Sequence, residues 1–278
     1  MTTNIAVLSG ATSVGKSALT ANLGALMAQR GQRVRLTGLD RQRTLSLWYG
    51  HDVDPDEGEL YSADLLKGKG RIRTGEVDAN GKPVKRVPTV EDIERPTMID
   101  GLTVVPEAIE LENDAIRLAQ LGNVGETLTS AMRSAPPVDC NLYDGPGELN
   151  ILSAAAIAAA DKIIICVSPT IKQVAIDRLL ERAEQFRTPV AAVVPNIVPS
   201  KRDGGFYPAV LAELGKQHAD VVTKQTIRRQ HWVDEAYAEA TPLPVAFPDA
   251  EVTEDYRKLL DELDEHGVTP AVKASTPA

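Results

Sequence analysis

The chain has 278 residues, of which 43% are hydrophobic and 25% are charged, and it contains two cysteines. This composition is typical of a globular protein and excludes disordered, collagen-like and disulfide-framework chains. The net charge of −9 excludes a surface coated with basic residues, although it leaves room for a local basic patch. Because there is no leader-type N-terminus and no apolar stretch of about 18 residues, we expect a soluble cytoplasmic protein without membrane contacts.

The first 40 residues predict a strand, a helix and a second strand. Residues 4–8 form a short apolar run typical of a buried strand, and apolar residues then recur at helical spacing as far as Arg30. Gly31 ends this helix, and residues 34–39 form the second strand. A strand–helix–strand unit of this length implies that the two strands are parallel.

Apolar strands continue to alternate with helices along the rest of the chain. This pattern predicts an α/β fold, with a mostly parallel twisted sheet and helices on both of its faces. We expect residues 1–266 to form a single domain and residues 267–278 to form a disordered tail. The further predicted strands are 102–105, 141–144, 163–167 and 190–194, and the further helices are 151–160, 174–186, 207–218, 230–240 and 254–266.

An insertion near residues 67–87 combines a hairpin pattern with positive charge. Asn80-Gly81 lies between alternating residues, which predicts a β-hairpin with a two-residue turn. Two interpretations remain open for the insertion, a solvated surface hairpin and an arm that contacts a polyanion. Its basic residues, set against only Glu76 and Asp78, are Lys67, Lys69, Arg71, Arg73, Lys82, Lys85 and Arg86.

The phosphate-binding motif G-x-x-x-x-G-K-[ST] stands at residues 10–17, between the first strand and the first helix. Its glycines let successive backbone N–H groups point at phosphates, and the helix adds its positive N-terminal end. Lys16 is expected to bridge the β- and γ-phosphates as a catalytic cation, and the Ser17 hydroxyl to bind Mg²⁺. The expected nucleotide-binding residues here are Gly10, Ala11, Thr12, Ser13, Val14, Gly15, Lys16, Ser17 and Ala18.

Two aspartates follow predicted strands at the edge of the sheet that carries this loop. Asp144 ends the strand 141–144, where a second carboxylate can bind Mg²⁺. Asp40 follows the second strand, where a carboxylate can orient the attacking water and contribute to the metal site. A turn-forming role for Asp144 and a helix-capping role for Asp40 remain alternatives.

These segments together resemble the ParA/MinD family of P-loop ATPases, which have a deviant Walker A motif. The resemblance includes Leu39-Asp40-Arg41-Gln42, the run 143–147, and the segments 226–236 and 242–245. It implies ATP and Mg²⁺ as cofactors, an ATP-dependent homodimer and non-specific binding to DNA. It also implies a weak ATPase stimulated by a ParB-like or other cargo-adaptor protein, associated with the nucleoid, that partitions plasmids or chromosomes or positions cargo.

The resemblance assigns further site residues. Asn196 matches an adenine-contacting asparagine, and Pro244, Val245 and Phe247 match a loop that covers the base. Contacts to DNA phosphates, without base readout, are implied for a C-terminal basic cluster. That cluster consists of Lys224, Arg228 and Arg229, with Lys201 and Arg202 as neighbours.

Three positions depart from the family pattern. Arg41 stands where the family has a proline after the aspartate that corresponds to Asp40. The family's signature lysine, five residues before Lys16, is Ala11, and the first aspartate of its D-x-D segment is Gly38. Because phosphate charge in a dimer interface needs neutralisation, we expect Arg41 or Arg43 to supply a second cation. Two other functions remain open, a metabolic P-loop enzyme of the dethiobiotin synthetase type and a nucleotide-gated scaffold with negligible turnover.

Overall fold

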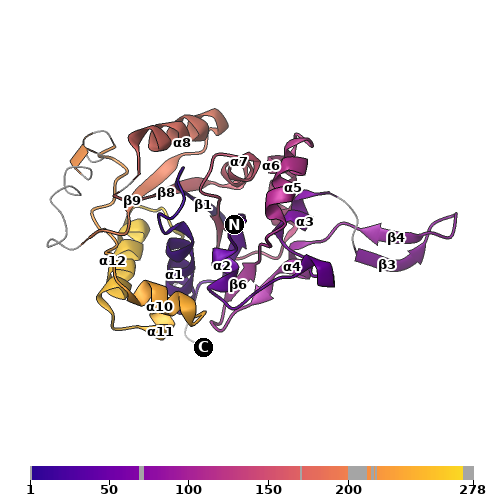
Figure 1. The fold of residues 1–278 in the computed structure, drawn as a ribbon, viewed down its shortest axis with the longest axis horizontal. Coiled ribbons are helices and arrows are strands. Elements are labelled where there is room, and N and C mark those ends of the chain that lie inside the picture. The colour runs from indigo at the N-terminus through magenta and orange to yellow at the C-terminus, as the bar shows by residue number, and fades with distance from the viewer. Residues whose placement is uncertain are drawn as a thin grey trace.

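The computed structural model describes residues 2–68, 72–169, 171–199, 212–213, 216 and 218–271. These residues form a seven-stranded sheet that is parallel except for its short edge strand β5 (Figure 1). The predicted fold class is therefore confirmed. The strand order across the sheet is β5 (Arg95–Pro96), β6 (Leu102–Val105), β2 (Val34–Gly38), β7 (Cys140–Asp144), β1 (Thr3–Leu8), β8 (Lys162–Val167) and β9 (Val190–Pro195).

Helices cover both faces of the sheet, because side chains on each strand point alternately to the two sides. Ile5 and Val7 of β1 face one hydrophobic core, whereas Ala6 and Leu8 face the other. The first core packs against α1 (Lys16–Gln29), α2 (Thr44–Leu47), α10 (Trp232–Ala238), α11 (Leu243–Ala246) and α12 (Glu251–Glu265). The second packs against α3 (Ser62–Leu66), α5 (Leu111–Ala119), α6 (Val124–Ser134), α7 (Ile151–Ala159) and α8 (Gln173–Phe186).

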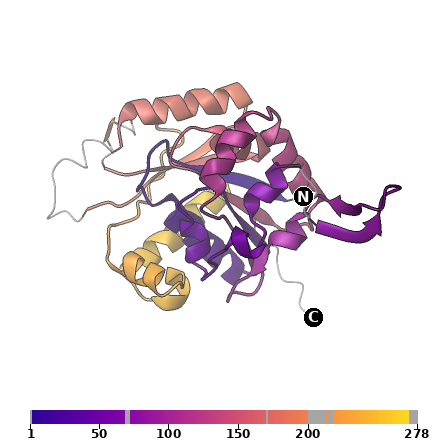
Figure 2. The same cartoon turned by 45° about the vertical axis from the view of Figure 1, so that its right-hand side comes forward.

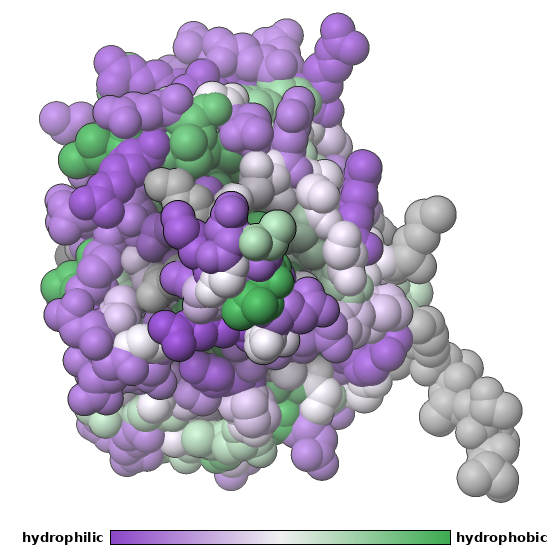
Figure 3. Space-filling model, turned by 90° about the vertical axis from the view of Figure 1, so that its right-hand side faces the viewer, coloured by the Kyte–Doolittle hydropathy of each residue, from purple (hydrophilic) through white to green (hydrophobic). Residues whose placement is uncertain are grey.

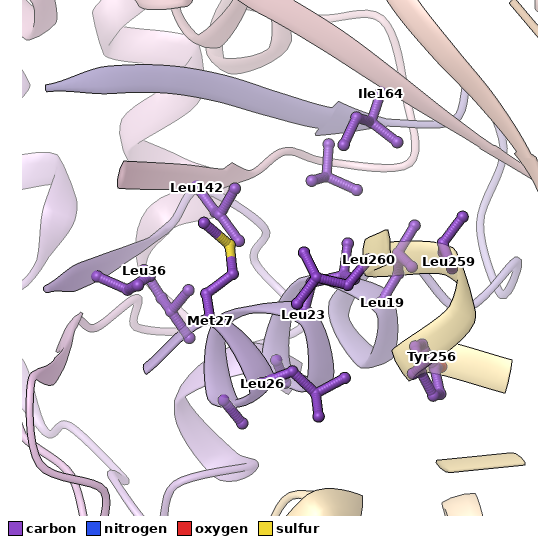
Figure 4. Packing of buried hydrophobic residues seen from close by; sticks show 14 of the residues in the cluster. Leu19, Leu23, Leu26, Met27, Leu36, Leu142, Ile164, Tyr256, Leu259 and Leu260 are labelled. Atoms are coloured by element: carbon purple, nitrogen blue, oxygen red, sulfur yellow. The ribbon is translucent and has the colours of Figure 1, made fainter. Parts of the chain in front are cut away.

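Helix α1 lies in the middle of the first core, directly after the phosphate loop. Its leucines and Met27 lie between the sheet residues Leu36, Leu142 and Ile164 and helix α12 (Figure 4). Each fully buried side chain of this size contributes roughly 1.5–3 kcal/mol by leaving water. The start of α1 is therefore fixed firmly relative to the sheet.

The predicted hairpin is present as β3 (Ile72–Val77) and β4 (Pro83–Arg86), a separate antiparallel pair. It projects from the side of the molecule that carries α4 (Val90–Ile93), and that side is mostly hydrophilic (Figures 1, 2 and 3). Its turn has five residues, 78–82, instead of the predicted two. The reason is Asp78, whose side chain accepts the N–H groups of Asn80 and Lys82 and so closes a wider turn.

The C-terminal segment differs from the predicted disordered tail. Gly267 has φ +64° and turns the chain back at the end of α12, and the following Val268 and Thr269 are buried. Gln32 Nε2 also donates to the Pro270 carbonyl at 2.6 Å. The packed domain therefore extends beyond residue 266, whereas residues 272–278 lie outside the described ones, as does most of the predicted helix 207–218.

Candidate functional site

The phosphate loop leaves β1 between its two neighbours, β7 and β8, and leads into α1. Gly15, at the N-cap of α1, has φ +82°. A Cβ at this position would lie 2.4 Å from Asn196 Nδ2, so only glycine fits both the backbone conformation and the space. The shape of the loop therefore depends on Asn196, which follows the edge strand β9.

Asn196 supports the phosphate loop from the end of β9. Its Nδ2 donates to the carbonyl oxygens of Val14 and Gly15, at 3.0 and 3.3 Å. Its Oδ1 accepts the N–H of Ile197, and the residue is only 3% exposed. Asn196 borders the pocket next to the loop, but its amide is engaged by the protein here, and the adenine contact stays a prediction.

A buried charged centre lies under the loop, where β2 and β7 end. Lys16 Nζ is 3.8 Å from Asp40 Oδ2, and the two side chains are 5% and 7% exposed. Asp144 Oδ1 accepts a long hydrogen bond of 3.4 Å from the Thr20 hydroxyl. Burial raises the pKa of Asp144 to about 7, against the opposing effects of Lys16 and the hydroxyl donors.

The residues of this centre fit a magnesium ion. Asp144 Oδ2 is buried and has no hydrogen-bond partner among the described residues. Buried polar atoms are nearly always satisfied, so this oxygen is available as a ligand for a cation. Mg²⁺ typically takes one or two protein oxygens and completes its shell with water and phosphates.

The raised pKa of Asp144 predicts a pH-dependent effect of Asp144→Asn on the metal-free protein. Because the folded pKa rises from 3.8 to about 7, this carboxyl favours folding at acid pH and loses that contribution as the pH rises through 7. An amide avoids this loss. In EDTA, the Tm of the variant relative to that of the wild type should therefore increase between pH 5.5 and pH 8.

Adding Mg²⁺ and ATP should reverse this order at pH 8, because ligand binding stabilises only the protein that retains the metal ligand. Asp177→Asn, an exposed change on α8, is the matched control and should show neither effect. An advantage of Asp144→Asn that does not change with pH would contradict the assigned environment of this carboxyl.

Asp40 closes a tight turn as well as facing Lys16. Its Oδ1 accepts the N–H of Gln42 at 3.1 Å, and its carbonyl accepts the N–H of Arg43. The N-cap of α2 is Arg43, with φ +56° and no side-chain capping bond, so Asp40 is not the capping residue of that helix. Its other oxygen, Oδ2, is the atom directed at Lys16.

Glu107 is a further residue of this edge that the sequence analysis did not select. It lies two residues after β6, is fully buried, and accepts hydrogen bonds from Leu45 and Ser46 at the start of α2. Burial is the main cause that raises the pKa of Glu107 to about 8. The available signal was its place after an apolar strand, where Asp40 and Asp144 also lie.

A pocket of about 480 Å³ opens beside the phosphate loop. Thr44 and Trp48 line one side and the segment 227–237 lines the other, but Pro244, Val245 and Phe247 are not among its lining residues. The structure thus does not bring the predicted base-covering loop to this pocket. The cause is a tertiary contact, since Asn22 Oδ1 accepts the N–H of Leu243 and Gln29 donates to the Pro244 carbonyl, which hold α11 against α1.

Comparison with known proteins identifies the family. The chain is 28% identical over 185 residues to a probable plasmid-partitioning protein ParA of Thermus thermophilus, covering 66% of this chain but only 50% of that protein. It is 25% identical over 274 residues to the sporulation initiation inhibitor protein Soj of Bacillus subtilis, covering 95% and 98% of the two chains. A family model described as an AAA domain, AAA_31, matches residues 2–192. The chain belongs to this family, as a ParA-like P-loop ATPase.

The fold of this ParA-like ATPase also matches solved structures. An McdA variant of Cyanothece in complex with ATP superposes with a TM-score of 0.78 at 17% identity, over 98% of this chain and 99% of that one. At this identity the match establishes the fold alone. Within the described residues of the ParA-like chain, no helix combines the length and apolarity needed to cross a membrane.

The basic residues of this ParA-like chain are unequally available for DNA. Arg228 forms a bidentate ion pair with Asp255 and a second pair with Glu251, so its charge is largely neutralised. Lys224 and Arg229 are exposed and form no ion pair within the described part of the chain. Lys201 and Arg202 lie outside the described residues.

The two arginines expected to replace the signature lysine are engaged elsewhere. Arg41 pairs with Glu112 and Arg43 with Asp52, and both pairs are at the surface. A second cation from Arg41 or Arg43 therefore requires its ion pair to open, and its presence in a nucleotide-bound dimer stays a prediction.

Proposed function

We propose that the chain is a partition or cargo-positioning ATPase that dimerises on ATP, binds DNA non-specifically and hydrolyses ATP when a partner stimulates it. The observation that carries this proposal is the centre of Lys16, Asp40 and Asp144 under the phosphate loop of a ParA-like fold. Its cofactors are ATP and Mg²⁺, for which the loop and the unpartnered Asp144 oxygen provide the binding groups.

Different residues of this site contribute to phosphate binding, metal binding and orientation of the attacking water. Backbone N–H groups of the loop and the Lys16 ammonium bind the β- and γ-phosphates and stabilise the charge that develops there. Ser17 and Asp144 would hold Mg²⁺, which when bound neutralises phosphate charge. Asp40 lies 3.8 Å from Lys16 and can accept a hydrogen bond from the attacking water, which orients it in line with the γ-phosphate.

A groove next to Asp40 supports the proposed dimer. It has a volume of about 360 Å³, lies between α5 and α7, and includes Arg41 and Ile116 among its lining residues. Ile116 is 66% exposed, whereas isoleucine side chains are usually buried. Covering this groove with a second copy would bury apolar surface and exclude water from the phosphates.

DNA binding should depend on Lys224 and Arg229 in the dimer. The double variant Lys224→Ala/Arg229→Ala should weaken binding about tenfold for all sequences alike and reduce the slope of log K against log salt by about 2 per monomer. ATP affinity is measured in parallel, because Arg229 also lines the pocket beside the phosphate loop. The measurement is a salt titration of binding to unrelated DNA duplexes in the presence of ATP and Mg²⁺.

Arg73→Ala/Lys85→Ala on the hairpin is the matched control, because it removes the same charge from a different side of the molecule (Figure 1). If this control weakens DNA binding and the first variant does not, the DNA surface is the hairpin. If the wild type shows no salt-sensitive binding to DNA, the partition function fails, and the metabolic P-loop enzyme becomes the better hypothesis.

A further inference from the structure

The carboxyl group of Glu107 occupies the space that any side chain at Gly38 would need. A Cβ at Gly38 would lie 1.7 Å from Glu107 Oε2 and 2.4 Å from its Cδ. Real Cβ atoms do not approach other atoms this closely, so position 38 must be glycine while Glu107 keeps its place. The two positions are therefore coupled, although they are 69 residues apart in the numbering of the chain.

The strand register explains how the two residues meet. β2 lies between β6 and β7, with Thr37 opposite Val105 and Gly38 opposite Asp144. Glu107 follows two residues after Val105, so its side chain reaches across the end of β2. The family that the sequence resembles has an aspartate at the position of Gly38. In this chain, a carboxyl group comes to the same end of β2 from the neighbouring strand.

Glu107 caps the helix that follows Asp40. Its Oε1 accepts the N–H groups of Leu45 and Ser46, at 3.1 and 3.3 Å, which are the second and third residues of α2. Its Oε2 accepts the Ser46 hydroxyl at 2.6 Å, and the Glu107 N–H donates back to that hydroxyl at 3.0 Å. These first-turn N–H groups normally bond to an N-cap side chain, which α2 lacks.

Helix α2 and the turn before it contribute two parts of the nucleotide site. Asp40 begins the turn and lies 3.8 Å from Lys16, and Thr44 and Trp48 line the pocket beside the phosphate loop. A helix of four residues that starts at a non-glycine residue with positive φ has little stability of its own. Asp40 is joined to this helix by the bonds that it accepts from the N–H groups of Gln42 and Arg43, so its orientation depends in part on what holds α2 from outside.

We propose that Glu107 is a positioning residue for ATP hydrolysis, which holds α2 and thereby Asp40, and that it replaces the carboxylate that Gly38 cannot supply. This inference rests on the proposed ATPase function. It predicts that the carboxyl group can be moved from β6 to β2 without loss of activity, because both positions direct it to the same place.

The test is an exchange of the carboxyl group between the two strands. Glu107→Ala should lower kcat at least about tenfold, because it leaves the N–H groups of α2 unpaired, while the Kd for ATP changes less than about threefold. Gly38→Asp alone should lower kcat at least as much, because two carboxyl groups then compete for one space. The double variant Gly38→Asp/Glu107→Ala should recover kcat to within about threefold of the wild type. Glu181→Ala, an exposed change on α8, is the matched control.

Two readouts separate failure of this inference from failure of the proposed function. If the wild type shows no more ATP turnover than Lys16→Ala, the ATPase proposal fails, and amide hydrogen exchange at Leu45 and Ser46 then decides the role of Glu107. Protection of these amides should be lost in Glu107→Ala and restored in the double variant. The inference is overturned if Glu107→Ala leaves both kcat and this protection unchanged, or if the double variant is no better than Glu107→Ala alone.

Discussion

Lys16→Ala is expected to abolish ATP binding, weakening the affinity by more than about 100-fold, which corresponds to roughly 2.7 kcal/mol. Lys16 is the side-chain cation of the phosphate loop and is only 5% exposed, so its charge acts on the phosphates with little screening by water. Titration with a fluorescent ATP analogue in the presence of Mg²⁺ measures the loss. Micromolar affinity in the variant would contradict the assignment of this loop.

The variant needs two controls, because Lys16 also faces Asp40 and Asp144. Its removal leaves two buried carboxyl groups without a nearby ammonium, so circular dichroism and thermal unfolding must show that the fold is retained. Lys258→Ala, on the exposed face of α12, removes a lysine whose one ion pair among the described residues is with its helix neighbour Glu254, and it should leave ATP binding intact.

Asp40→Ala is expected to retain ATP affinity within about threefold and to lower kcat by at least about 100-fold, the usual range for a group that orients or accepts a proton. The expected split arises because, in the proposed site, the loop and Lys16 bind the phosphates, whereas Asp40 acts on the attacking water. Steady-state ATP hydrolysis with DNA present, measured alongside ATP binding, checks both parts.

A second substitution separates the two roles of Asp40. Asp40→Asn retains an oxygen that can accept the N–H of Gln42 and so preserves the turn, but it removes the negative charge that faces Lys16. If Asp40→Asn hydrolyses ATP as slowly as Asp40→Ala, the carboxylate is needed for the reaction. Full activity of Asp40→Asn would instead show that Asp40 only shapes the turn.

The parts of the structure that could be predicted depend on local sequence. The parallel strands of the central sheet, the phosphate loop and α1 follow from apolar periodicity and from residues 10–17, and each begins and ends within two residues of its expected bounds. The short antiparallel edge strand β5 was not predicted. Their positions relative to one another also follow, since parallel strands place Asp40 and Asp144 at the same edge as the loop.

The parts that could not be predicted depend on contacts between distant residues. The neutralisation of Arg228 requires Asp255 from α12, and the displacement of Pro244 from the pocket requires Asn22 from α1. The role of Glu107 appears only when β2 pairs with β6, because nothing in its own neighbourhood in the sequence points to Gly38. A single sequence without aligned relatives does not contain these pairings.

Substitutions in the β3–β4 hairpin can change one surface of the molecule without affecting the nucleotide site. None of the described strand residues of the hairpin is buried, and its base is tied to the body by the Arg86–Asp92 ion pair. Substitutions along its strands therefore cost little folding stability and do not reach the phosphate loop. Changes in what this arm contacts can thus accumulate without altering the surroundings of Lys16, Asp40 or Asp144.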